Sequence, residues 1–193
     1  MRPTGPAQHG ELLLDIVGIL SELAIPYAVI GALATSFYGI PPSTTDGETM
    51  VWMKGTGKTE RDLTDRLAEA GYRATFKQGD LDDPILGSII VEDEHGNRVD
   101  LLLGIRGMDP DAAGRCVSAR LLDSSISMIA AEDLIPMKIS AGGFQDITDV
   151  RGILQVSGEL VNLELLRQLA ARYGAAVTRK LNELLNEYPP TGT

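Results

Sequence analysis

Short runs of strand-forming residues lie between residues 27 and 129, whereas the sequence after residue 130 carries the three-and-four spacing of amphipathic helices. This separation is the feature that most restricts the fold, because a sheet and a helical cluster each need their own apolar surface to pack against. It predicts an α+β protein in which helices flank a mixed sheet. Residues 1–130 would form this core and residues 131–193 a helical C-terminal region.

The individual elements follow from local patterns. Strands are expected at 27–30, 48–53, 72–77, 85–91, 98–103, 119–122 and 127–129. Helices are expected at 11–24, 32–38, 134–141, 146–156, 163–173 and 177–186, with another opened by 55–59 and ended by Gly71. The turn-like composition of residues 92–97 predicts that the two strands beside it form an antiparallel hairpin.

Composition excludes several classes of function. The chain has 17 Lys and Arg against 27 Asp and Glu, a formal charge of -10, which argues against a general electrostatic grip on nucleic acid, and no DNA partner is expected. One cysteine and two histidines cannot build a disulfide framework or a Cys/His zinc site. No apolar run approaches the roughly 20 residues that cross a bilayer. We expect a cytoplasmic protein with no membrane partner.

Three acidic residues suggest a metal site. Asp46 and Glu48 flank Gly47 where a loop enters a strand, and alternate strand residues share a face, so both carboxylates can point at one spot. Asp100 stands in a strand of Val and Leu residues, where a carboxylate is costly unless it is paired, solvated or bound to a cation. Three oxygen ligands suit Mg²⁺ or Mn²⁺. The alternative for the first two is a pair of solvated acids at a loop end.

A glycine between a strand and a helix suggests a phosphate site. Gly31 follows the apolar run Tyr27–Ile30 and precedes a helical pattern. Free backbone N–H groups and the positive end of the helix dipole at such a junction can hold a triphosphate. The segment Gly55–Thr59 does not form a Walker loop, because Trp52 occupies the position of its first glycine.

Together these residues resemble the nucleotidyltransferase superfamily. The matching positions are Ile30–Ala32, Asp46–Glu48 and Asp100, and the surrounding sequence looks most like minimal enzymes related to the abortive-infection nucleotidyltransferase toxins. Residues 131–138 and 145–150 are similar to the helical region that follows in that group. The resemblance spans roughly residues 12 to 155 and implies a nucleotidyltransferase-like sheet.

The resemblance also implies a reaction. A metal-bound nucleoside triphosphate (NTP) would give its nucleoside monophosphate to an RNA, protein or small-molecule acceptor and release pyrophosphate. In this scheme Asp46 and Glu48 hold the metal ions, while Asp100 completes the site and helps to deprotonate the acceptor hydroxyl. The implied nucleotide-binding residues are Gly31, Ala32, Lys138 and Asp146. Asp149 would lie near the nucleotide or order the helical region. The chain would be the toxin of a toxin–antitoxin pair, with an antitoxin protein as partner.

Four positions depart from the family pattern. Ala32 replaces a Gly or Ser, Glu48 replaces an Asp, and Gly47 stands where an apolar residue is usual and is expected to weaken strand packing. Gly142–Gly143 occupies the place where relatives often carry an arginine. Ala32, Gly47 and Gly143 support an alternative, a catalytically degenerate member that acts as a binding or regulatory module.

Local alternatives also exist for the polar residues of the helical region. Lys138 would then be a solvated helix residue, Asp146 a helix N-cap and Asp149 a first-turn acid.

Overall fold

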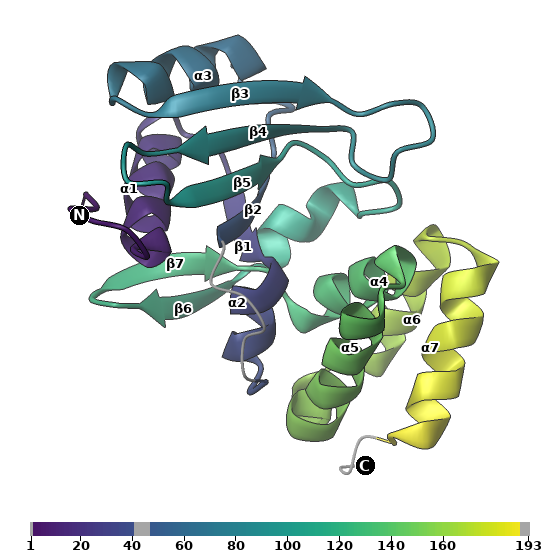
Figure 1. Cartoon of the computed structure of the whole chain (residues 1–193). Helices are drawn as coiled ribbons and strands as arrows, with labels where there is room; N and C mark the ends of the chain where they lie inside the picture. The colour runs from purple at the N-terminus through teal and green to yellow at the C-terminus, as the bar shows by residue number, and fades with distance from the viewer. Residues whose placement is uncertain (1, 41–46, 190–193) are drawn as a thin grey trace.

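The computed structural model describes residues 2–40 and 47–189. The strands found in these residues join into one mixed sheet with the order β3-β4-β5-β2-β1-β7-β6 (Figure 1). The strands are β1 (Tyr27–Ile30), β2 (Gly47–Val51), β3 (Arg73–Gln78), β4 (Gly87–Glu92), β5 (Arg98–Leu102), β6 (Val117–Leu121) and β7 (Ser124–Met128).

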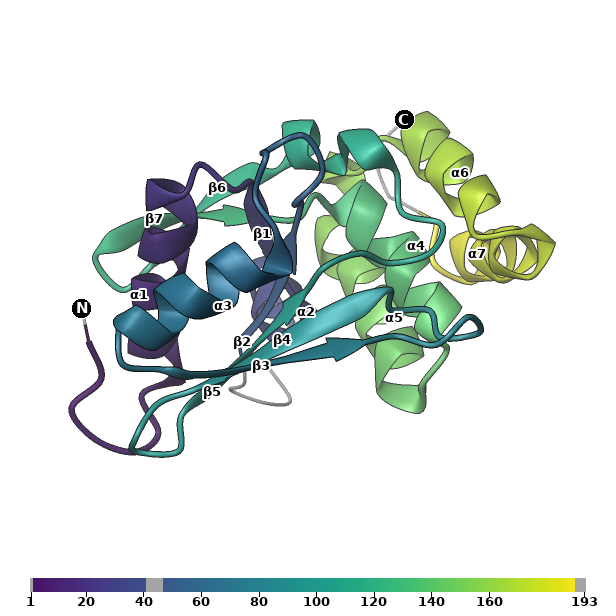
Figure 2. The same cartoon turned by 90° about the horizontal axis from the view of Figure 1, so that it is seen from above.

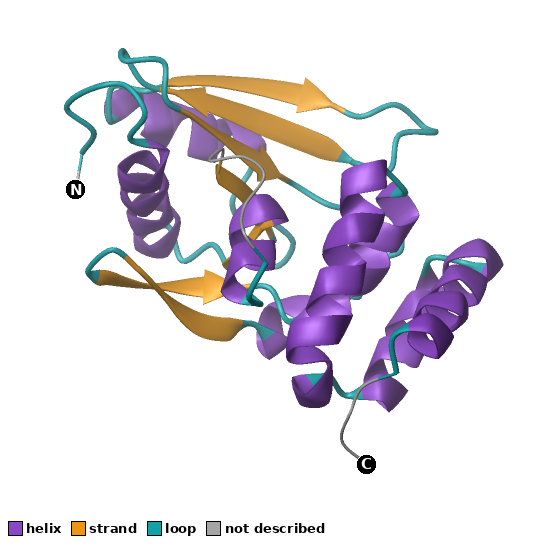
Figure 3. Ribbon diagram, turned by 60° about the horizontal axis from the view of Figure 1, so that its bottom comes forward, coloured by secondary structure: helices purple, strands orange, loops and turns teal. Residues whose placement is uncertain are grey.

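The helices lie mainly in two groups, with α2 between them (Figure 2). The helices are α1 (His9–Glu22), α2 (Gly31–Phe37), α3 (Glu60–Glu69), α4 (Ala131–Ala141), α5 (Phe144–Ser157), α6 (Leu163–Arg172) and α7 (Ala175–Glu187), with short 3₁₀ turns at Pro110–Arg115 and Gly158–Leu160. Seen from above, α1 and α3 lie toward one end of the molecule and α4–α7 toward the other (Figure 2). The colouring by secondary structure shows the same separation of sheet and C-terminal helices (Figure 3). The α+β prediction is therefore confirmed.

The predicted elements are confirmed with small shifts of their ends. The hairpin of β4 and β5 is antiparallel as expected, and the two short strand candidates after residue 116 pair as a second antiparallel hairpin, β6 and β7. α4 and α5 begin three and two residues before their predicted starts, which changes the capping residues. α4 begins at Ala131 without a side-chain cap, and α5 begins at Phe144, so Asp146 is not the N-cap.

Strand pairing in the middle of the sheet places the acidic residues. β2 runs antiparallel to β1 and parallel to β5, and Glu48 is the register partner of Ile30 on one side and of Asp100 on the other. Residues directly opposite in neighbouring strands share a face of the sheet. Glu48 and Asp100 therefore project from the same face.

The opposite face of these strands forms the core beneath α1. Thr49 and Leu101, which alternate with the acids, are fully buried, as are Leu13 and Ile16 of α1. None of the helices in the described residues is long and apolar enough to cross a bilayer.

A buried ion pair joins the sheet region to the start of the helical region. The Asp133 side chain is almost fully buried at the start of α4, and Arg115 donates to its two carboxylate oxygens at 2.8 and 3.0 Å. Removing one partner of such a pair leaves a charge without compensation in a poorly solvated place.

Arg115→Met should therefore lower the free energy of unfolding by about 2–3 kcal/mol, less than for a fully enclosed pair because Arg115 keeps part of its surface in water. Denaturant unfolding measures this change. The matched control is Arg120→Met, whose partner Asp123 is exposed and which should change the free energy of unfolding by less than about 0.5 kcal/mol. Equal effects of the two substitutions would contradict the prediction.

Candidate functional site

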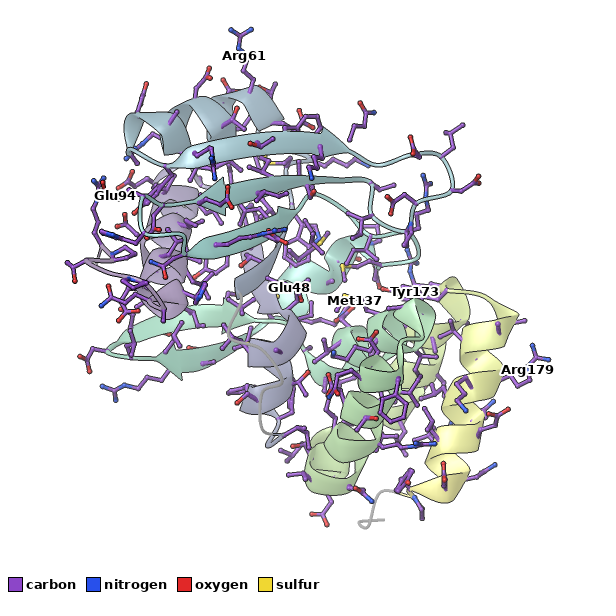
Figure 4. The ribbon with its side chains drawn as sticks, in the orientation of Figure 1. Glu48, Arg61, Glu94, Met137, Tyr173 and Arg179 are labelled. Carbon is purple, nitrogen blue, oxygen red and sulfur yellow. The ribbon has the colours of Figure 1, made fainter. Side chains whose placement is uncertain are left out.

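A cavity of about 260 Å³ lies between the sheet and the start of the helical region. It contains four of the predicted site residues, Gly31, Glu48, Lys138 and Asp146. The remaining lining residues are Ile30, Pro84, Ile85, Leu102, Ile105, Met137, Ser140 and Ala141. Figure 4 shows Glu48 of β2 and Met137 of α4 close to each other at this junction. A larger surface hollow of about 650 Å³ between α6 and α7 contains none of the predicted residues.

The two described acids of the predicted metal site lie side by side. Glu48 is exposed, and its register partner Asp100 keeps 29% of its side-chain surface in water. Arg98 donates to both oxygens of Asp100 at 2.7 and 2.8 Å from the same strand. Asp46 lies outside the described residues, so its part in the site stays a prediction. Within the described residues, no three His, Cys, Asp or Glu side chains gather as metal ligands.

The donor chemistry of this pair fits a divalent cation. Two carboxylates on neighbouring strands offer hard oxygen ligands on one face, which is what Mg²⁺ and Mn²⁺ prefer. Arg98 already supplies a positive charge to Asp100, and its side chain is 46% exposed. A half-exposed ion pair of this kind contributes at most about 1 kcal/mol, so a metal ion can compete with Arg98 for the carboxylate.

Gly31 brings the backbone directly against Glu48. Its φ of +64° lies in the left-handed region, and a Cβ added there would stand 2.0 Å from Oε2 of Glu48. A side chain at this position is thus disfavoured by the backbone conformation and can be accommodated only if the Glu48 carboxylate moves. Ala32 follows on the first turn of α2, is partly exposed and is not among the residues that line the cavity.

The expectation that Gly47 weakens strand packing is wrong. Gly47 is buried on the face toward α1, where an added Cβ would meet Val99 at 3.1 Å and Leu13 at 3.7 Å. These two side chains fill the space that a residue larger than glycine would occupy. The strand therefore packs without a hole at this position.

Lys138 is not a solvated helix residue. Its side chain is 6% exposed, and its Nζ lies 2.7 Å from Asp149 and 3.2 Å from Asp146. Asp149 is also not a first-turn acid, because it is the sixth residue of α5 and only 4% exposed. The local alternatives for both residues are thus overturned by their burial, and Lys138 reaches the cavity wall already paired.

Comparison with known proteins gives fold relatives only. No family model and no curated protein sequence matches the chain. An antigenic nucleotidyltransferase-like protein from Paracoccidioides brasiliensis has a similar structure, with a TM-score of 0.56 and 16% identity over 96% of this chain and 91% of that one. The antibiotic-resistance factor ANT(2'')-Ia matches with a TM-score of 0.59 and 13% identity, covering 93% of this chain and 96% of its own.

This chain has a nucleotidyltransferase-like fold. At identities of 13–16% the likeness concerns the fold alone. The relation to abortive-infection toxins stays a prediction.

Within the nucleotidyltransferase-like fold, Gly142 and Gly143 shape the turn between α4 and α5. Gly142 ends α4 in the left-handed conformation with φ +69°, and Gly143 precedes the first residue of α5. Asp146 accepts the N–H of Gly143 at 3.3 Å. The tight turn thus places Asp146 in the first turn of α5, facing Lys138 of the preceding helix.

Several residues at the site were missed by sequence reasoning. Arg98 had a readable signal, because it stands two residues before Asp100 on one strand and must share its face. No sequence signal pointed to the other three residues. Gln145 donates a hydrogen bond to Asp149, and Ile85 pairs with Ile105 between two loops at the cavity wall. Their contacts depend on how distant segments pack.

Proposed function

We propose that this chain is a metal-dependent nucleotidyltransferase that moves a nucleoside monophosphate from an NTP to the hydroxyl of an acceptor, with release of pyrophosphate. The observation that carries the proposal is the in-register pair Glu48 and Asp100, on the sheet face beside a cavity that also holds Gly31 and Lys138. This arrangement combines cation ligands, a glycine whose backbone phosphate oxygens can approach, and a positive charge. These are the features that binding of a triphosphate requires.

Each residue has a proposed part in the reaction. Glu48 and Asp100, together with Asp46, would hold Mg²⁺ or Mn²⁺, which when bound neutralises phosphate charge. Gly31 would let phosphate oxygens approach the backbone, and Lys138 would contact a phosphate from the cavity wall. Asp100 would take the proton from the acceptor hydroxyl as it attacks the α-phosphorus, and pyrophosphate would leave with the electron pair of the broken P–O bond.

A small molecule is the proposed acceptor. The fold relative ANT(2'')-Ia is known in complex with adenylyl-2''-tobramycin. The formal charge of -10 on this chain also disfavours a polyanionic acceptor such as RNA. RNA and protein acceptors, including the targets of a toxin, are the other outcomes of the experiment below.

A regulatory module that binds nucleotide without chemistry is the second candidate. The observation behind it is that the proposed groups already form ion pairs: Asp100 pairs with Arg98, and Lys138 pairs with Asp146 and Asp149. The two candidates differ in whether bound NTP is consumed.

The deciding experiment supplies each of the four α-labelled NTPs with Mg²⁺ or Mn²⁺ and with separate small-molecule, RNA and protein fractions of a cell extract. We expect metal-dependent transfer of label to the small-molecule fraction and stoichiometric release of pyrophosphate. NTP binding without transfer to any fraction would establish the regulatory module. A folded protein that neither binds nor consumes any NTP would refute both candidates.

A further inference from the structure

A largely buried cluster of polar and charged side chains at the cavity connects α2, α4 and α5. Lys138 of α4 contacts Asp146 and Asp149 of α5, and the Thr35 hydroxyl of α2 lies 3.5 Å from Oδ2 of Asp149. Thr35 donates its hydrogen bond at 3.0 Å to the carbonyl oxygen of Gly31. The cluster therefore links Gly31, which faces Glu48, to Lys138, which lines the same cavity.

The two carboxylates that contact Lys138 differ in their surroundings. Asp149 is 4% exposed and does not line the cavity. Its Oδ2 accepts from Lys138 at 2.7 Å and its Oδ1 accepts from Gln145 at 2.7 Å. Asp146 lines the cavity, keeps 31% of its side-chain surface in water and holds Lys138 at the longer distance of 3.2 Å.

These differences decide which contact can be exchanged. A buried carboxylate that loses its cation has no water to replace it, so Asp149 has to keep Lys138. Asp146 can rehydrate from the cavity side and loses little when the lysine contact breaks. A phosphate that enters the cavity competes for the same ammonium hydrogens, and a doubly charged oxyanion group is a stronger acceptor than a partly solvated carboxylate.

We propose that Asp149 is a positioning residue that holds the Lys138 ammonium at the cavity wall, and that Asp146 is an exchangeable partner which a nucleotide phosphate displaces. This inference rests on the proposed function and assigns opposite roles to two acids that touch the same lysine. Asp146 keeps the lysine charge compensated in the empty site. Asp149 keeps the ammonium aimed when the phosphate arrives.

The test compares Asp146→Asn with Asp149→Asn by measuring dissociation constants for ATP and for adenosine, in the presence of Mg²⁺. Asp146→Asn should tighten ATP binding about three- to fivefold, because it removes a competitor worth at most about 1 kcal/mol. Asp149→Asn should weaken ATP binding about tenfold or more, because it removes the charged hydrogen bond that aims the ammonium. Adenosine binding should be unchanged in both, since it lacks the phosphates that contact Lys138.

The decisive result is that the two substitutions change ATP affinity in opposite directions. If the two carboxylates acted only as nearby negative charges, both substitutions would tighten ATP binding, and the proposal would be overturned. In a Lys138→Met background Asp146→Asn should have no effect on ATP affinity, because there is no ammonium for which Asp146 and the phosphate can compete. Asp123→Asn, which removes an exposed charge at the β6–β7 turn, is the matched control and should leave ATP affinity unchanged.

A second variant tests the positioning role in case Asp149→Asn does not fold. Gln145 is exposed, so Gln145→Ala should leave the fold intact while removing one of the bonds that orient Asp149, and it should weaken ATP binding about threefold. Tightening, or no change, would count against the positioning role. Failure of the wild-type chain to bind any NTP would instead refute the proposed function itself, which separates the two possibilities.

Discussion

Glu48→Gln is expected to lower the rate of nucleotidyl transfer about a thousandfold while leaving the folded state intact. The substitution keeps the size of the side chain but removes the charge that would bind the divalent cation, and cation stabilisation of a phosphoryl transition state is worth several kcal/mol. Glu48 is exposed on the sheet face, so its replacement should change the free energy of unfolding by less than about 0.5 kcal/mol. Initial rates and thermal unfolding of the same preparation measure the two effects.

The matched control for Glu48→Gln is Glu94→Gln. Glu94 has a side chain that is 88% exposed in the turn between β4 and β5, and the substitution makes the same change of charge. It should leave the transfer rate within a factor of two of the wild type. A Glu48→Gln protein that retained a tenth of the wild-type rate would remove Glu48 from the metal site and leave the proposed mechanism without its main ligand.

Gly31→Ala is expected to reduce transfer about a hundredfold at a cost to stability of only about 1–2 kcal/mol. The backbone at φ +64° costs an alanine roughly 1 kcal/mol. The new Cβ would also stand 2.0 Å from Oε2 of Glu48. Because this oxygen is at the free end of a flexible side chain, the carboxylate can swing away without disturbing the core. That movement relieves the clash but takes the proposed metal ligand out of register with Asp100.

Gly57→Ala separates the two contributions. Gly57 has a φ of +71°, and an added Cβ would meet nothing within 4 Å. This control should therefore lose about 1 kcal/mol of stability from the backbone alone and keep full transfer activity. Denaturant unfolding and initial rates on both variants test the comparison. An equal loss of activity in the two proteins would show that the effect at Gly31 is general destabilisation rather than displacement of Glu48.

Much of the fold could be predicted because its signals are local. The alternation of apolar residues in Arg98–Leu102 and the helical spacing after residue 130 depend on neighbours a few positions away. The strand–glycine–helix order around Gly31 is equally local, and it marked a position that the structure shows to need glycine. The prediction that Asp46 and Glu48 share a face rests on the same kind of local alternation.

Predictions from local sequence failed for polar residues whose role depends on burial. Lys138, Asp146 and Asp149 each have a reasonable solvated or capping interpretation within their own helix. The structure instead brings α4 and α5 together at a glycine turn, so that the lysine meets both acids. Gly47 was misread for the same reason, since Leu13 from α1 and Val99 from β5 fill its place.

The sequence by itself determined which segments are strands or helices and where glycine permits a sharp turn. Tertiary structure alone decided that β2 and β5 run parallel with Glu48 opposite Asp100, and that Lys138 lines the same cavity as Glu48. The physical reason is that periodicity describes a residue relative to its own element. Register between strands and the pairing of buried charges depend on the packing of segments that are distant in the chain.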